Sequence, residues 1–561
     1  MTRLPGLMEE DGMHDPLDAG FALARGAVPA GLRRCAWDVL LQRDAAAARA
    51  AARDAAGSVL EIARRCLVGD DLAAAVRALD VGRGLALFAA TEFVDVAARL
   101  DRAGRPGLAT RWRMVTGGAG DIPADLRTAA RAALSGDGDG DGDGDGDGDG
   151  DGGDPALAGL LDPPGLPDIR AALAALDTDA LVYLVPGTDR MPGWAVMVPA
   201  AGPPSLMVLP GLVPDVGVER LLAAVSAPDL VGDAPGGEAV AGSLDALCDW
   251  AWGAAVGPLA ERFLPALPPA AGGRPPRVVL VPVGDLARVP WHAARRGDGT
   301  HAVRLVAFSQ TVSARMLCRS AAASAVPLLP VGLVVADPRT GEGTTDLVAA
   351  RTGAEAVHRS FYPGARYVGR RPDGTTSTSG AGTAAEVRDW LTSGRPGAGA
   401  MLHLACHGVS QPAAGDTTSH LVLAGPDGRL TAEELVALLA KVPDRAIGLV
   451  VLAACRTGVA GRGHDAAFGL GAAFLAAGVR TVLSTQWSAP EQDTSVLVYM
   501  FHHHLMVERR PAWDALRRAQ LWMLDPRREV PPAMPEALTR RLAGADPARV
   551  VAWAGLVHSG Q

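Results

Sequence analysis

A run of alternating glycine and aspartate, residues 136–154, most constrains how this chain of 561 residues folds. The run carries nine aspartates and no apolar side chain, so it cannot bury surface, and its like charges repel one another. A calcium site is the alternative, but calcium-binding nonapeptide repeats need an apolar residue in each turn and an EF-hand needs a closing glutamate. Neither occurs here. We therefore predict a flexible linker without metal, with separate folded regions on either side.

The linker also explains the net charge of −9. Without its nine aspartates the acidic residues equal the 53 basic ones, so the folded part is close to neutral. A near-neutral surface argues against nucleic acid as the main ligand. The single lysine, Lys441, follows Ala440 rather than glycine, which excludes the phosphate loop of nucleotide-binding proteins.

The cysteines and the long apolar runs indicate in which cellular compartment the protein functions. Six cysteines in a chain of this length, none of them in a C-x-x-C pair, support neither a disulfide framework nor a zinc ribbon. The N-terminus lacks the basic and apolar regions of a signal peptide. The long uncharged runs are broken by prolines or are shorter than a membrane-spanning helix. These observations predict a soluble protein in the reducing cytoplasm, without a membrane partner.

Residues 18–135 have the apolar spacing of helices. Apolar residues recur every three or four positions in several segments that are rich in alanine, leucine and arginine. Short breaks at Gly69 and at Gly104–Gly107 separate them. This favours an all-α region, residues 1–135, built from degenerate repeat-like helix pairs. The predicted helical segments are 36–56, 58–67, 71–79, 84–100 and 124–134.

After the linker the pattern changes to α/β. Uninterrupted apolar segments alternate with helical ones, which is typical of a mostly parallel sheet covered on both faces. The predicted strands are 180–185, 194–198, 277–283, 331–336, 400–406, 447–454 and 480–484.

Two of these strands end in potentially reactive residues. The strand Met401–Cys406 runs into His407 and Gly408, and the strand Leu449–Ala454 runs into Cys455. The carboxyl ends of neighbouring parallel strands meet at one edge of a sheet, which would bring a nucleophile and a base together. The backbone N–H groups of Gly408 and Cys455 could then form an oxyanion hole.

Spacing alone leaves a second interpretation open. A cysteine at the end of an apolar strand is usually a small buried hydrophobic residue, and a loop histidine usually makes surface hydrogen bonds. Three other sites have ordinary explanations as well. We expect Cys406 to be buried, His403 to be a packed strand residue that could orient His407, and His502–His504 to spread around a helix rather than face one metal ion.

Several motifs, in order, resemble the CHAT family of caspase-like cysteine peptidases. The strand ends His403–Gly408 and Ala453–Gly458 are similar to the family's H-x-A-x-H-G and S-A-C-x-T-G patterns. Other segments resemble its hairpin, its L-T-A-x-E helix start, its A-F-L-x-A-G-A-R segment and its closing strand. The resemblance covers about residues 170–561. These further segments are 421–423, 430–435, 473–480, 485–494, 553–557 and, upstream, 283–291.

The resemblance implies a fold, a reaction and a division of the chain. It implies a caspase-like α/β fold, with a supporting part over residues 155–330 and a catalytic part over residues 331–561. Cys455 would be the nucleophile, His407 the general base and acid, and Gly408 part of the oxyanion hole. The reaction would be hydrolysis of a protein substrate through a thioester, without a cofactor. The helices, similar to tetratricopeptide repeats, would bind an activating partner in bacterial defence or regulated cell death.

The chain departs from the family pattern next to the nucleophile. Ala453 replaces the usual serine, and Arg456 replaces the usual acidic residue. Arg456, Asp465 and Asp416 are candidates to line a substrate pocket, although Asp465 could instead cap the following helix. Two rival functions stay open from the sequence: a non-enzymatic interaction scaffold and a different Cys–His acyl transferase.

Overall fold

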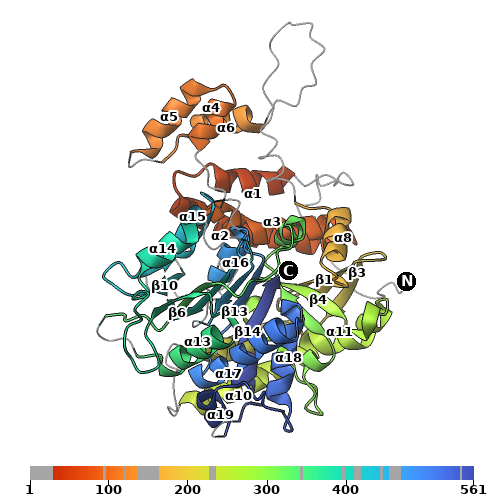
Figure 1. Cartoon of the computed structure of the whole chain (residues 1–561). Coiled ribbons are helices and arrows are strands. Elements are labelled where there is room, and N and C mark those ends of the chain that lie inside the picture. The colour runs from red at the N-terminus through yellow and green to blue at the C-terminus, as the bar shows by residue number, and fades with distance from the viewer. Residues whose placement is uncertain are drawn as a thin grey trace, which may run out of the picture.

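A computed structural model describes eleven stretches of the chain, and the predicted linker 136–154 lies outside them. A helical region comes first along the chain, followed by two sheets that are flanked by helices (Figure 1). The described residues are 30–91, 96–118, 121–135, 163–225, 236–341, 345–393, 398–409, 419–442, 446–453, 469–543 and 546–561.

The N-terminal region is helical, as predicted. Its first two helices divide differently from the expected segments, because the Asp44 side chain accepts the Ala47 N–H at 2.8 Å and starts a new helix. That helix continues through Gly57. A glycine inside a helix destabilises it by only about 1 kcal/mol relative to alanine, and no neighbouring atom lies within 4 Å of where a Cβ would be. The helices are α1 (Ala30–Leu40), α2 (Ala45–Val68), α3 (Leu72–Thr91), α4 (Val96–Arg102), α5 (Pro106–Thr116) and α6 (Ala124–Ser135).

Helix α3 packs directly on the α/β part. Its side chains share a hydrophobic core with the first sheet, and it contacts helices α12 (Ala314–Ala322), α15 (Ala432–Leu439) and α16 (Leu470–Ala476). The buried Asp80 carboxylate accepts the backbone N–H groups of Ala314 and Arg315 at the start of α12. Arg83 donates to the Val312 carbonyl at 3.2 Å. The helical region and the α/β part are therefore bonded through buried polar groups as well as apolar contact.

The first sheet has five strands in the order β3-β2-β1-β4-β5. Strand β1 pairs in parallel with β4, and β4 with β5, whereas β2 and β3 form an antiparallel extension. The three strands predicted here are confirmed, and the short β3 and β5 are additional. Their bounds are β1 (Ala180–Val185), β2 (Gly193–Pro199), β3 (Ser205–Leu209), β4 (Arg277–Pro282) and β5 (Ala307–Gln310), with helices α8 (Leu166–Ala175), α9 (Val216–Val225), α10 (Gly236–Ala251) and α11 (Gly257–Arg262).

The second sheet has six strands in the order β14-β13-β12-β8-β6-β7, all parallel except the edge strand β14. The four strands predicted here are confirmed, and so is the predicted α/β class. The strands are β6 (Gly332–Ala336), β7 (Arg366–Gly369), β8 (Met401–Ala405), β12 (Leu449–Leu452), β13 (Thr481–Thr485) and β14 (Leu556–Gly560).

Helices cover both faces of the second sheet (Figure 1). Alternate strand residues supply the two cores, as Val334 and Val451 do on one face and Val335 and Val450 on the other. One face packs on α13 (Val348–Phe361), α17 (Glu491–His502), α18 (Ala512–Leu524), α19 (Glu536–Leu542) and α20 (Val550–Trp553), and the other on α14 (Ala384–Thr392), α15 and α16.

A small antiparallel sheet follows β8. It consists of β9 (His407–Val409), β10 (His420–Val422) and β11 (Arg429–Thr431), which confirms the predicted hairpin. The spacing of Thr431 and Glu434 predicts a capping box, and one is present at the start of α15, because Thr431 accepts the Glu434 N–H and Glu434 accepts the Thr431 N–H. Within the described residues, no helix combines the length and apolarity that crossing a membrane requires.

Candidate active site

The two strands that lead to the predicted dyad are neighbours. Strands β8 and β12 pair in parallel, with Leu404 opposite Leu452. In the sequence His407 follows Leu404 by three residues, and Cys455 follows Leu452 by three residues. Four of the predicted site residues lie outside the described residues, namely Cys455, Arg456, Asp416 and Asp465.

His407 begins strand β9 and is only partly buried. Its ring nitrogen Nε2 lies 2.8 Å from the backbone carbonyl oxygen of Thr345. A carbonyl oxygen can only accept a hydrogen bond, so Nε2 carries the proton. In the neutral ring Nδ1 therefore keeps a lone pair, which is what a general base needs.

Gly408 lies next along strand β9, opposite Leu421 of β10. The ladder between β9 and β10 also pairs His407 with Val422, so both residues are held by a regular strand. The contribution of the Gly408 N–H to an oxyanion hole stays a prediction.

A narrow cavity lies between the ends of the central strands and the helices α13 and α17. Its interior volume is about 40 Å³, and the figure rises to about 540 Å³ only when the open space at its mouth is counted. The described residues that line it are mainly small or apolar, and Glu491 adds an acidic side chain. Ala453, two positions before Cys455 in the sequence, is part of the wall. The lining residues are Leu347, Ala350, Gly353, Ala354, His403, Ala405, Cys406, Ala453, Thr485, Trp487, Ala489, Glu491, Thr494, Ser495 and Val498.

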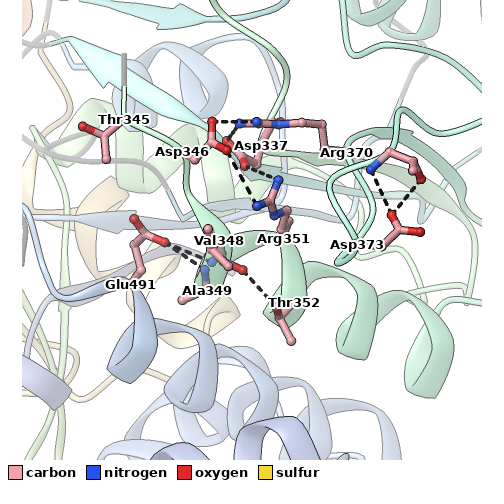
Figure 2. Close-up of polar contacts among 12 residues, drawn as sticks. Asp337, Thr345, Asp346, Val348, Ala349, Arg351, Thr352, Arg370, Asp373 and Glu491 are labelled. Atoms are coloured by element: carbon pink, nitrogen blue, oxygen red, sulfur yellow. Dashed lines mark hydrogen bonds and ion pairs between the residues drawn. The ribbon is translucent and has the colours of Figure 1, made fainter. Parts of the chain in front are cut away.

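Glu491 is a residue that sequence reasoning assigned wrongly. Its spacing from Ser488 predicts a capping box for its own helix, but α17 begins at Glu491 after Pro490 without a side-chain cap. The carboxylate instead accepts the N–H groups of Ala349 and Ala350 at 3.1 and 3.3 Å, at the start of α13 (Figure 2). Burial raises the pKa of Glu491 above its usual value, and the hydrogen bonds from the Ala350 and Ala349 N–H groups oppose that rise. Pro490 was the signal against the box, because a proline disfavours the helical conformation of the residue before it, here Ala489, which would be the first helical residue after Ser488.

His403, His502 and His504 are packed side chains. His403 is 2% exposed, and burial lowers its pKa to about 4, so the ring is neutral. His502 is buried, and its Nδ1 lies 3.0 Å from the Tyr362 hydroxyl, whereas His504 bonds to Glu508. The described part of the chain contains no cluster of three or more metal-ligating side chains. Cys406 is buried, as expected, at the wall of the cavity.

Comparison with known proteins decides the family. The model of the CHAT domain matches residues 245–561, which is more than half of the chain. The chain belongs to the CHAT family. This confirms the resemblance to the CHAT family that the strand-end motifs indicate. No curated protein matches the chain.

Solved structures of gingipain R and of a separase–securin complex are among those similar to this chain. The Arg-specific cysteine proteinase gingipain R is 10% identical with a TM-score of 0.32, covering 57% of this chain and 67% of that chain. The separase–securin complex of Saccharomyces cerevisiae is 9% identical with a TM-score of 0.42, covering 87% of this chain and 37% of that chain. A second structure of that complex gives 8% identity and a TM-score of 0.45, with the same coverage. This chain thus spans little more than a third of the separase chain.

Proposed function

We propose that this CHAT protein is a cysteine endopeptidase in which Cys455 is the nucleophile and His407 is the general base. The observation that carries the proposal is the register of β8 and β12, in which Leu404 pairs with Leu452. Two residues that each follow this pair by three positions are expected to meet at the carboxyl edge of the sheet. Family membership supports the same assignment.

The tautomer of His407 fits the proposed reaction. Its Nδ1 takes the proton of the Cys455 thiol, and the thiolate adds to the carbonyl carbon of the scissile peptide bond. The N–H groups of Gly408 and Cys455 stabilise the resulting oxyanion. The imidazolium then gives its proton to the leaving amine, which yields a thioester. Water, deprotonated by the same nitrogen, hydrolyses the thioester and frees the thiol.

The cavity suggests which substrate residue precedes the cleaved bond. Its apolar walls suit an aliphatic stem, and Glu491 supplies a partly buried negative charge. Pairing with a cation would offset the cost of burying that charge. We therefore propose a preference for arginine or lysine at this position, with Arg456, Asp416 and Asp465 as further pocket candidates.

We also propose that a partner protein regulates the peptidase through the N-terminal helices, in the bacterial cytoplasm, during defence or regulated cell death. The supporting observation is that α3 contacts α16, the first helix after the segment that carries Cys455. A partner that displaces α3 would change the packing of α16.

The test uses the full-length chain and fluorogenic peptides that differ only in the residue before the reporter. We expect hydrolysis of arginine and lysine peptides, and none by Cys455→Ala. Cys406→Ala is the matched control, because it also removes a thiol near the cavity, and it should retain activity. Activity that survives Cys455→Ala but is lost in Cys406→Ala would disprove the assignment of the nucleophile.

Glu491→Gln tests the substrate preference separately. It keeps an oxygen that can accept the α13 N–H groups but removes the charge, so the advantage of arginine over an uncharged residue should fall about tenfold or more. Two results together would favour a non-enzymatic scaffold over an enzyme. The Cys455 thiol would be no more reactive toward iodoacetamide than a thiol in an unfolded peptide, and no peptide would be cleaved with or without a partner.

A further inference from the structure

The carbonyl that receives the His407 proton belongs to a segment without regular structure. Thr345 lies three residues before helix α13, and its carbonyl oxygen accepts the Nε2–H of His407 at 2.8 Å. The orientation of the histidine ring therefore depends on how firmly this short segment is held. Asp346 is the next residue, and its carboxylate is tied to the sheet (Figure 2).

A buried arginine holds Asp346. The guanidinium of Arg370, just after strand β7, donates from Nη1 to the Asp346 carboxylate at 2.6 Å. The same guanidinium donates from Nε to the Asp337 carbonyl at 2.8 Å and pairs through Nη2 with the Asp337 carboxylate at 2.7 Å. Arg370 and Asp337 are 7% and 1% exposed. A guanidinium bound at three nitrogens has little freedom to turn, so it fixes the position of Asp346.

The contacts form a closed path back to the histidine. The Asp337 N–H donates to the carbonyl of Ala405 at 2.7 Å, and Ala405 ends strand β8, two residues before His407. The path thus joins the end of the strand that precedes the histidine to the carbonyl that accepts its proton. Asp337 has φ +41°, an uncommon conformation for a residue other than glycine, at the end of β6.

The charges of this network are balanced. Arg351 adds a second guanidinium, 3.5 Å from Asp337 and 3.8 Å from Asp346. Arg339 also acts on Asp346, and Glu491 interacts with Asp337, so three arginines balance three carboxylates. The cluster therefore lacks the surplus positive charge of a site for an anionic ligand. Its structural effect is to hold the segment that begins at Thr345.

We propose that Asp346 is a positioning residue for His407, and the proposal rests on the proposed function. By anchoring its segment to Arg370, Asp346 keeps the Thr345 carbonyl on Nε2 of His407. This contact holds the ring in one orientation and keeps the lone pair on Nδ1, directed to where the thiol proton is taken up. Asp346 does not touch the substrate, so its loss acts on the chemical step rather than on binding.

The test compares Asp346→Ala and Asp346→Asn with wild type in the full-length chain. The side chain of Asp346 is 57% exposed, so both variants should fold. We expect Asp346→Ala to lower kcat about tenfold and to leave KM within about twofold, because positioning is lost but binding is not. Asp346→Asn keeps an acceptor for Arg370 and should retain most of kcat. Asp373→Ala is the matched control, since this nearby exposed carboxylate bonds within its own turn to Thr375.

A second measurement separates this proposal from the proposed function. The rate at which iodoacetamide alkylates Cys455, followed by mass spectrometry of its peptide, reports the thiolate without any substrate. It should fall about tenfold in Asp346→Ala. If His407→Ala slows alkylation but Asp346→Ala does not, or if Asp346→Asn loses as much as Asp346→Ala, the positioning role is wrong and the dyad stands. If His407→Ala also alkylates at the wild-type rate, the dyad itself fails.

Discussion

The two sheets of this protein share their central architecture but differ at the carboxyl ends of their parallel strands. After β4 of the first sheet, the chain enters buried turns around Leu286, Val289 and Trp291, which complete an apolar core. After β6, β8 and β12 of the second sheet come Asp337, His407 and the cavity wall at Ala453. Both sheets have parallel strands that end at one edge. In the part of the chain that the structure describes, His403, Cys406 and Glu491 line a cavity near those ends of the second sheet.

The comparison teaches that parallel pairing alone does not make a site. Neighbouring parallel strands bring their ends together in both sheets. In the first sheet the residues at those ends contribute free energy of folding through apolar burial. In the second sheet they include the buried charged side chains of Asp337 and Arg370, which add nothing to an apolar core. The strand ends of the first sheet therefore contribute to folding stability, and those of the second sheet are the candidates for catalysis. Substitutions in each region can test this difference.

The largest expected effect is the loss of activity on removing the proposed base. His407→Ala should lower kcat/KM by about 10²–10⁴, the usual contribution of general acid–base catalysis. Because His407 is only partly buried, the free energy of unfolding in urea should change little. If His407→Ala left kcat/KM unchanged, the strand ends of the second sheet would have no catalytic role that the first sheet lacks.

Two tryptophans give a matched pair for the next effect. Trp291 in the first region and Trp487 at the cavity are both almost completely buried. Each Trp→Ala variant should lower the free energy of unfolding by about 3–5 kcal/mol, measured by urea denaturation. At urea concentrations where both variants are still folded, only Trp487→Ala should change KM, because Trp487 lines the cavity. An equal change of KM in Trp291→Ala would show that the first region also shapes the substrate site.

The pH dependence of stability should show the cost of buried neutral histidines. Burial lowers the pKa of His403 to about 4, compared with about 6.5 in an unfolded chain, so the unfolded state binds more protons between these values. Stability is therefore complete above about pH 6.5 and falls as the pH falls toward 4, by up to about 3 kcal/mol from this residue. His403→Gln should flatten the pH dependence of the urea midpoint. Part of the pH dependence should remain in this variant, because His292 is buried in the first region and also has a pKa of about 4.

The smallest effect concerns the contact between the helical region and the α/β part. Asp80→Ala removes the acceptor for two N–H groups at the start of α12 and should cost about 1–2 kcal/mol in urea unfolding. Asp125→Ala, on the exposed surface of α6, is the control and should be neutral. If Asp80→Ala were neutral too, the polar contacts of α3 would not fasten the regions together.

Much of the fold followed from local patterns. The strand predicted at 180–185 coincides with β1, and the paired apolar segments before His407 and Cys455 are neighbours as expected. Strands β3, β5 and β7 were missed because each has only four or five residues, too few to show a clear apolar pattern. The helix starting at Thr431 was predictable because its cap lies within four residues.

What the sequence by itself determined is the class of each region and the residues that strand ends present, because apolar periodicity and capping act over a few residues. Only the tertiary structure decided which distant groups those residues meet. Glu491 bonds to Ala349 across 142 positions, and His407 to Thr345 across 62. These partners depend on how helices and strands dock, and docking is set by the summed burial of many side chains rather than by any motif.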